Sequence, residues 1–447
     1  MLFSNQDLKK IIIPLVIEQF LTVTIGMLDT VMVAHAGEAA VSGVSLVDSI
    51  NLLMVYIFNA LAAGGAVVIS QFMGAGKMNN ANKAAKQLVW VVVAVSVVVM
   101  TVMLVFRKAL LALVFGSVTS DVMANAQIYF LYTALSYPFL GLYNAGASIF
   151  RAMGNSKVSM RASLMMNLVH LFINAILIYA LGMGAAGAAI STLISRILGA
   201  AMIMFLVYDK NLPVHVEKLF SYKPDFKIIK RICGIGIPNG AENGMFQFGK
   251  VITQSLVSAM GTVSIAANAA AGGLVSLQYA PGTAMGLVMI TVVGRCVGAE
   301  EKKQAKMYAY KLLGIAYSIM APLAIIMAVF SKPLVGLYGL SPEAAGMAQQ
   351  LLIIHSIILA LIHPIAFCLG NSFRAANDVK YTLIISIASM WIFRVGLSYI
   401  FAGILGWGVM GVWFAMFSDW VVRALFFGVR LVRGTWLTKY KALETNQ

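Results

Sequence analysis

The sequence predicts an all-α polytopic membrane protein with twelve transmembrane helices in two six-helix lobes around a central cleft. Three observations predict this fold. Of the 447 residues, 61% are hydrophobic and only 11% are charged, which is unlike a soluble domain. The apolar residues form continuous runs of about 20 residues or more, as membrane helices require and the alternating strands of a β-barrel do not. In addition, the second half of the chain repeats the first.

Twelve apolar runs mark the predicted spans. They are 11–34, 45–72, 87–106, 123–149, 160–181, 185–208, 232–258, 264–293, 308–330, 346–372, 382–402 and 408–430. Basic residues collect at the two termini and in alternate loops, at 77–86, 151–161, 209–231, 295–306 and 374–380. The opposite loops offer only Arg107, Lys108 and Lys332. Because basic loops stay on the cytoplasmic side, both termini are predicted to be cytoplasmic.

Several functional classes are excluded. The net charge of +16 does not indicate a nucleic-acid partner, because the basic residues lie between spans, where they orient a membrane protein. Cys233, Cys296 and Cys368 lack metal-ligand or redox spacing. The largest segment outside the spans, 209–231, is too short for a catalytic domain, and no nucleotide-binding loop occurs. We therefore expect neither an enzyme nor a primary pump, no cofactor, and no cleavable signal before the first span.

The first span carries two acids inside its apolar run. Glu18 and Asp29 are eleven residues apart, which is about three helical turns, so both project from one face. An ionised carboxylate in hydrocarbon costs about 2.5 kcal/mol or more, so a buried acid normally faces a protein interior or a wet cavity. Each acid is either a hydrogen-bonded packing group or part of an ion or substrate pathway, and Asp29 is the stronger candidate for a pathway.

Comparing the chain with itself exposes a repeat at an offset of 224 residues. Pro14, Glu18, Gly37, Gly74 and Ala81 match Pro238, Glu242, Gly261, Gly298 and Ala305 without a gap. FRAMGNSK at 150–157 also matches FRAANDVK at 373–380. The predicted organisation is an N-terminal lobe at 1–208, a cytoplasmic linker at 209–231, a C-terminal lobe at 232–430 and a cytoplasmic tail at 431–447.

Six spans per lobe return the chain to the same side of the membrane, so the lobes are predicted to be parallel repeats. Transporters built in this way hold substrate between the halves and rock one half against the other. A channel with duplicated halves would need a selectivity filter or a repeated pore loop, and we find neither in the sequence. The duplication therefore favours a transporter.

Four stretches carry a family resemblance. They are LDTVMVAHAG at 28–37 after Pro14, ISQFMGAGK at 69–77, FRAMGNSK at 150–157 and LGMGAAGAAIST at 181–192. In their order and spacing the chain resembles the multidrug and toxic compound extrusion (MATE) family over essentially its whole length. This family belongs to the superfamily that includes multidrug, oligosaccharidyl-lipid and polysaccharide flippases.

The resemblance implies an ion-coupling site in the N-terminal lobe. Family members commonly place an acid at the position of Asp29 to bind the coupling proton or sodium ion, so Asp29 is the candidate sodium ligand. In some members a fifth-helix Asn, an Asp four residues later and a sixth-helix Thr complete the site. The matching residues here are His170, Asn174 and Thr192. A histidine beside an aspartate suits proton coupling, because imidazole titrates near neutral pH; alternatively, His170 only bonds a neighbouring helix.

The C-terminal lobe departs from that pattern. Some relatives carry an acid near Phe246, whereas here Glu242 stands one turn earlier and matches Glu18. Lys250 and Arg394 lie inside spans and need partners. Lys250 either pairs with Glu242 or answers an acid across the cleft. The predicted substrate-cavity residues are Glu18, Glu242, Phe246, Gln247, Lys250 and Arg394. Asp419 and Arg423 are predicted to form a structural pair.

The predicted function is secondary active export of small organic molecules, cationic or of mixed charge, in exchange for protons or sodium ions by alternating access. Two alternatives stay open: export of zwitterionic or anionic metabolites through Lys250 and Arg394, and flipping of a lipid-linked precursor. We expect a monomer in the bacterial cytoplasmic membrane. Its partners would be a small-molecule substrate and the lipid bilayer.

Overall fold

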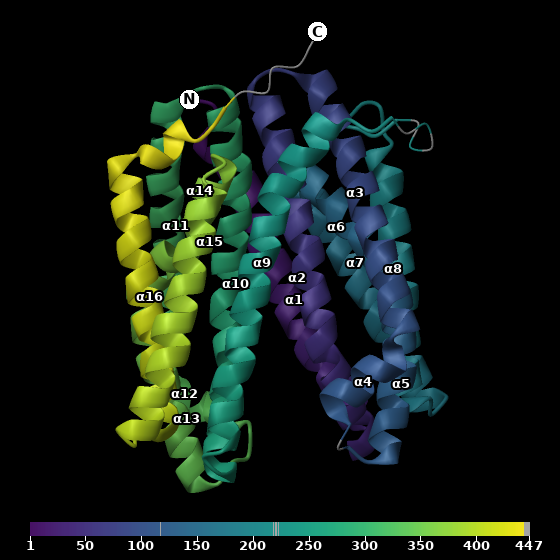
Figure 1. Cartoon of the computed structure of the whole chain (residues 1–447), viewed down its shortest axis with the longest axis vertical. Helices are drawn as coiled ribbons and strands as arrows, with labels where there is room; N and C mark the ends of the chain where they lie inside the picture. The colour runs from purple at the N-terminus through teal and green to yellow at the C-terminus, as the bar shows by residue number, and fades with distance from the viewer. Residues whose placement is uncertain (117, 218, 220, 222, 442–447) are drawn as a thin grey trace. The chain divides into compact units, whose positions relative to one another are not determined.

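The computed structural model describes residues 1–441 apart from 117, 218, 220 and 222, and every regular element within them is a helix (Figure 1). Helices are expected for apolar runs of this length, because a membrane span must satisfy its own backbone hydrogen bonds. The chain forms two compact units. The N-terminal unit is Lys9–Gly240, and the C-terminal unit is Met1–Leu8 with Ala241–Gln447.

Besides residues 226–240, which begin a long helix given below, the described part of the N-terminal unit holds nine helical elements. They are α1 (Asn5–Ala34), α2 (Glu38–Gly74), α3 (Met78–Val105), α4 (Arg107–Phe115), α5 (Ser120–Leu135), α6 (Tyr137–Ala152), α7 (Ser156–Ala175), the π-helix η1 (Ile176–Ala180) and α8 (Gly184–Val207). The central helix α2 packs against α3, α5 and α6. The predicted span 123–149 is divided between α5 and α6, because Pro138 has no N–H to continue the hydrogen-bond ladder across that point.

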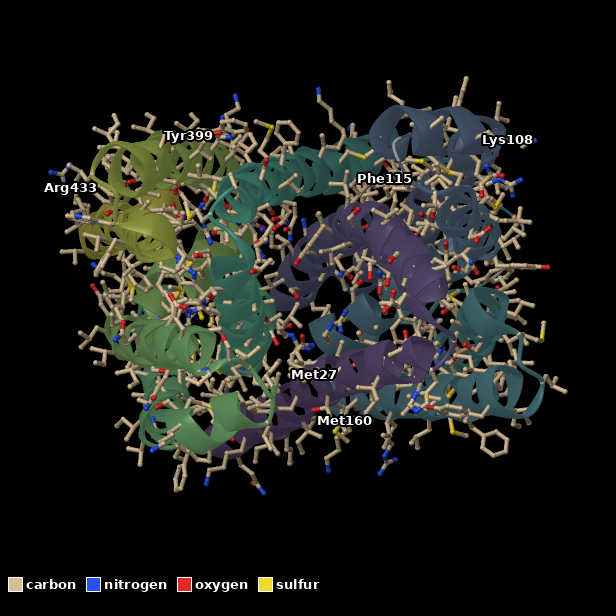
Figure 2. The ribbon with its side chains drawn as sticks, turned by 90° about the horizontal axis from the view of Figure 1, so that it is seen from below. Met27, Lys108, Phe115, Met160, Tyr399 and Arg433 are labelled. Carbon is tan, nitrogen blue, oxygen red and sulfur yellow. The ribbon has the colours of Figure 1, made fainter. Side chains whose placement is uncertain are left out.

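The C-terminal unit contains the remaining helices. They are α9 (Phe226–Ser258, which enters the unit at Ala241), α10 (Thr262–Gly298), α11 (Lys302–Val329), α12 (Ser331–Gly336), α13 (Pro342–His363), the π-helix η2 (Pro364–Cys368), α14 (Gly370–Ala375), α15 (Val379–Ala388), the π-helices η3 (Ser389–Gly396) and η4 (Tyr399–Ile404), α16 (Gly408–Arg433) and the 3₁₀-helix η5 (Thr435–Thr438). Here α10 is central and packs against α11, α13 and α14. Seen end-on, Lys108 and Arg433 point outward from their respective units (Figure 2).

Ten helices of the described chain are long and apolar enough to cross a membrane. The two other predicted spans are real helices that differ in a physical way. One is the pair α5 and α6, each only 16 residues long because of the break. The other is α9, whose apolar character is lowered by Glu242, Lys250 and several amides. The polytopic all-α fold predicted from the sequence is confirmed.

Both ends of the described chain meet the first turns of α11. The backbone N–H of Leu2 donates to Oε1 of Gln304 at 2.9 Å, and Nζ of Lys306 donates to the carbonyl of Val432 at 2.8 Å. The two ends therefore lie on the same side of the C-terminal unit. An even number of spans requires this arrangement.

The two halves repeat unusual backbone features at the offset found in the sequence. Gly37 and Gly261 precede the central helices α2 and α10 with φ angles of 95° and 89°, a region in which a β-carbon is costly. The π-helix at 176–180 likewise matches residues 400–404 of η4. The repeat is therefore a duplication of structure, and the parallel-repeat architecture is confirmed.

Candidate ion-coupling and substrate-binding sites

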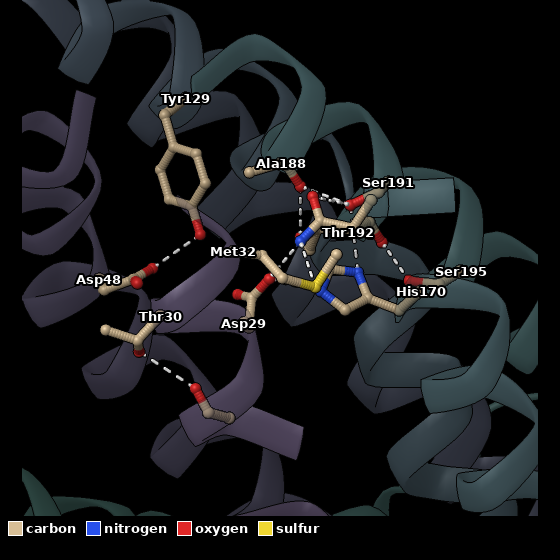
Figure 3. Close-up of polar contacts among 12 residues, drawn as sticks. Asp29, Thr30, Met32, Asp48, Tyr129, His170, Ala188, Ser191, Thr192 and Ser195 are labelled. Atoms are coloured by element: carbon tan, nitrogen blue, oxygen red, sulfur yellow. Dashed lines mark hydrogen bonds and ion pairs between the residues drawn. The ribbon is translucent and has the colours of Figure 1, made fainter. Parts of the chain in front are cut away.

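The carboxylate of Asp29 lies between α1 and α7 in the N-terminal unit. Nε2 of His170 is 3.0 Å from Asp29 Oδ1, and Nδ2 of Asn174 donates to the same oxygen at 2.6 Å (Figure 3). His170 and Asn174 are one turn apart on α7, so they reach the carboxylate from one face of that helix. No hydrogen bond from the described residues reaches Oδ2, and 24% of the side chain is exposed. One oxygen is thus held by two neighbours while the other stays open.

Ser191 on α8 joins Asp29, His170 and Asn174 in what we call the Asp29 cluster. Its Oγ is 3.2 Å from Nδ1 of His170 and 3.3 Å from Oδ1 of Asn174. Thr192, which the family resemblance implied, donates to the carbonyl of Ala188 at 2.9 Å, and Ser191 donates to the same carbonyl at 2.9 Å. Successive residues of a helix point about 100° apart, and among the described contacts only Ser191 also reaches the side chains of His170 and Asn174. Ser191 was not predicted, because the family resemblance points to the neighbouring position.

Asp48 on α2 is a second acid that the sequence analysis missed. Its Oδ1 accepts hydrogen bonds from Tyr129 OH at 2.9 Å and from Asn51 Nδ2 at 3.2 Å. Asn51 in turn accepts from Tyr137 OH at 2.8 Å. A signal for it existed, because an acid inside an apolar span was the criterion that selected Asp29.

Electrostatics connect Asp48 to the Asp29 cluster. The two carboxylates repel each other, and Arg196 on α8 attracts both. Nη1 of Arg196 donates to Ser136 Oγ at 2.7 Å, which holds the guanidinium in place. This part of the N-terminal unit therefore carries two acids, one guanidinium group and one imidazole. Within the described residues, no group of three or more His, Cys, Asp or Glu side chains could hold a metal ion.

Glu18 and Glu242 occupy equivalent positions in the two units, and each is buried against an arginine. Oε1 of Glu18 is 3.1 Å from Nη1 of Arg151, and its Oε2 accepts from Ser159 Oγ at 2.9 Å. Nη2 of Arg374 donates to Glu242 Oε2 at 2.6 Å. The arginines belong to the matching FRAMGNSK and FRAANDVK stretches, so the ion pair itself is duplicated.

The intramembrane bases of the C-terminal unit have different surroundings. Nε of Arg423 donates to Asp419 Oδ1 at 2.8 Å, which confirms the predicted pair. Lys250 is exposed on α9. The pairing of Lys250 with Glu242, one of the two predicted alternatives, does not occur, because Arg374 already neutralises that carboxylate.

Phe246 and Arg394 lie together in the C-terminal unit. The Phe246 ring centroid is 5.3 Å from Cζ of Arg394 and 5.2 Å from Cζ of Arg423. Nη1 of Arg394 is 3.9 Å from Asp419 Oδ2. Gln247 follows Phe246 on α9 and is partly buried. The aromatic ring of α9 thus covers two guanidinium groups.

Two duplicated helical units with charged clusters inside the spans define a polytopic membrane transporter. Comparison with known proteins identifies its family: the MatE family model matches residues 14–176 and 238–400, one match in each half. The chain belongs to this family of transporters, as the resemblance predicted, and it is not an enzyme.

The relatives are similar over almost their whole length. The chain is 28% identical to the uncharacterized transporter YisQ of Bacillus subtilis (strain 168), over 95% of this chain and 94% of the relative. It is 26% identical to the probable multidrug resistance protein NorM of the same organism, over 96% and 95%. Its fold matches the solved outward-facing conformation of a multidrug resistance MATE family transporter of the MOP superfamily, with a TM-score of 0.91 at 20% identity over 97% and 96% of the two chains.

Proposed function

We propose that the protein exports small organic molecules across the bacterial cell membrane in exchange for a proton or a sodium ion, by alternating access. The observation that carries this proposal is the Asp29 carboxylate, which has Oδ1 held by His170 and Asn174 and Oδ2 free of hydrogen bonds from the described residues. A carboxylate fixed in this way can take up and release a cation at its open oxygen without rearranging its neighbours.

The proposed coupling follows from charge. An ionised carboxylate inside a span is costly unless a cation neutralises it, and a proton, a sodium ion or a cationic substrate can do so. Asp48 adds a second negative charge near Asp29, and the single positive charge of Arg196 offsets only one of the two. If ion and substrate compete for this region and stabilise different packings of the protein, the binding of one drives release of the other.

The relatives support the substrate class. The Bacillus subtilis protein NorM is named as a probable multidrug resistance protein, which fits export of small organic compounds. The proposal includes a monomer with lobes at 1–208 and 232–430, with both termini in the cytoplasm. It also includes Glu18, Glu242 and Gln247 as residues near the substrate path.

The proposal is tested in proteoliposomes that contain the purified full-length protein and a fluorescent organic cation such as ethidium. Proton and sodium gradients are imposed separately, each with the membrane potential clamped. We expect ethidium to move against its own gradient when one of the two ions flows the other way. Ethidium movement that follows neither ion gradient would overturn the proposal.

His170→Gln should separate a proton-handling role from a packing role. Glutamine can still donate a hydrogen bond to Asp29, but it does not titrate, whereas imidazole changes charge near neutral pH. We expect gradient-driven transport to persist while its rate becomes less sensitive to pH. The matched control is His215→Gln, which makes the same change outside the spans. An unchanged pH profile would leave His170 as a packing residue.

A further inference from the structure

Arg394 in η3 is a buried guanidinium whose hydrogen-bonding capacity is unused. The residue is only 9% exposed, yet no hydrogen bond from the described residues reaches its side chain. The nearest carboxylate oxygen, Oδ2 of Asp419, is 3.9 Å from Nη1, which is too far for a hydrogen bond. A guanidinium presents five N–H donors in a planar fork, so Arg394 offers open donors at a position that little solvent reaches.

Asp419 does not balance the positive charge around it. The residue is 0% exposed, and Arg423 already occupies its Oδ1 at 2.8 Å. Glu242 is committed to Arg374 at 2.6 Å. Arg423 is also attracted to Glu242, so within the described residues three guanidinium groups, those of Arg374, Arg394 and Arg423, face two carboxylates. Uncompensated cations at this depth are costly, so an anion bound there would be stabilised.

Lys250 lies on the side of α9 that carries Phe246. It lies one turn after Phe246 on α9, and residues four apart on a helix are neighbours on its surface. The Phe246 ring covers the Arg394 guanidinium at 5.3 Å. Lys250 and Arg394 also interact electrostatically. No hydrogen bond or ion pair from the described residues reaches Nζ of Lys250.

The face of α9 that carries Lys250 is polar. Asn243, Gln247, Lys250 and Gln254 follow at intervals of four, three and four residues, so they share one face of the helix. The exposed apolar side chains of α9, which are Ile237, Phe248 and Val251, follow their own helical spacing on another face. The apolar face suits contact with lipid chains, and Lys250 is directed away from it.

The backbone around Arg394 has no counterpart in the first half. Arg394 matches His170 at the repeat offset, but His170 lies in the α-helix α7 whereas Arg394 lies in the π-helix η3. π-helical turns are rare and occur often at functional sites. The sign of the charge is also reversed: the N-terminal unit places a histidine beside an acid, and the C-terminal unit places an arginine beside a lysine.

We propose that Lys250 and Arg394 form an anion-binding subsite that takes a carboxylate or phosphate group, with the Phe246 ring as its apolar wall. Arg394 supplies a planar pair of donors and Lys250 a point charge. The group belongs either to a substrate or to a lipid headgroup. As a substrate subsite the inference rests on the proposed export function, and it adds molecules of mixed charge, with an acidic group as well as an amine, to the substrates that the protein can take.

The test is equilibrium binding to the full-length protein in phosphatidylcholine nanodiscs, with no ion gradient. The probes are ciprofloxacin, which carries an amine and a carboxylate, and its methyl ester, which keeps only the amine. We expect Lys250→Met to weaken binding of ciprofloxacin about tenfold and to leave the ester within about twofold. Lys302→Met, on the exposed start of α11, is the matched control. Equal effects on both probes, or none on either, would overturn the subsite.

Two further arms complete the test. Arg394→Lys keeps the positive charge but loses the planar pair of donors, so it should weaken the binding of ciprofloxacin and not that of the ester. A thermal melt checks that this variant folds. If it does not fold, Lys250→Glu is used in its place, and this variant should bind the ester more tightly than ciprofloxacin. Discs that contain phosphatidylglycerol distinguish a substrate from a lipid headgroup. If phosphatidylglycerol weakens ciprofloxacin binding to the unaltered protein but not to Lys250→Met, the subsite is assigned to lipid phosphate. Because binding needs no gradient, its outcome is independent of the gradient experiment, and failure of either proposal can be recognised separately.

Discussion

Asp29→Asn should reduce gradient-driven transport to the level of vesicles without protein, with the protein still folded. Asparagine has the same shape, and its side-chain carbonyl can accept the hydrogen bonds that His170 and Asn174 direct at Oδ1. It has no charge with which to hold a proton or sodium ion. The measurement is ethidium transport under separate proton and sodium gradients, together with the thermal unfolding temperature.

The matched control is Asp121→Asn, the same change at an exposed position in the first turn of α5. It should leave both the transport rate and the unfolding temperature unchanged. Undiminished gradient-driven transport by Asp29→Asn would contradict the role of Asp29 as the coupling acid. Loss of folding in that variant would show instead that the carboxylate organises the packing of α1 against α7.

Glu242→Leu should lower the free energy of unfolding by about 3 kcal/mol, because it leaves the charge of Arg374 buried without its partner. Both residues are less than 10% exposed, so solvent cannot replace the lost ion pair; their exposed fractions are 7% and 9%. The measurement is equilibrium unfolding of the detergent-solubilised protein. Glu18→Leu should have a similar effect in the N-terminal unit, where Arg151 is its partner.

The double variant Glu242→Leu with Arg374→Leu should recover much of that loss, because no buried charge is left alone. The matched control is Glu343→Leu, an exposed acid in the first turn of α13, which should cost no more than about 1 kcal/mol. If Glu242→Leu were as stable as the unaltered protein, the duplicated ion pair would not hold the fold together.

The sequence was sufficient to predict the architecture, because apolar length and the internal repeat can both be read without knowing how the helices pack. Apolar length identifies a span, and the matches of Gly37 with Gly261 and of Glu18 with Glu242 identify the duplication. The break between α5 and α6 could also have been predicted from Pro138, although 123–149 was predicted as one span. The π-helix η3 could not have been predicted, since no residue type in it marks a change of helical pitch.

The candidate coupling site was predictable only in part. Asp29, His170 and Asn174 came from the family resemblance, and the structure places them within hydrogen-bonding distance. Whether Ser191 or Thr192 faces them depends on the rotation of α8 about its own axis, which packing against α7 decides. Asp48 satisfied the same rule as Asp29, but its proximity to the cluster depends on how α2 packs.

For the buried charges, the sequence by itself determined that each needed a partner, because hydrocarbon does not tolerate an isolated charge. Only the tertiary structure decided which partner. Glu242 had a base two turns away in Lys250, yet it pairs with Arg374, which is 132 residues distant. The physical reason is that helix packing brought the Arg374 guanidinium to 2.6 Å from that carboxylate, while the Arg394 guanidinium of η3 came to lie 5.3 Å from the Phe246 ring, one turn further along α9.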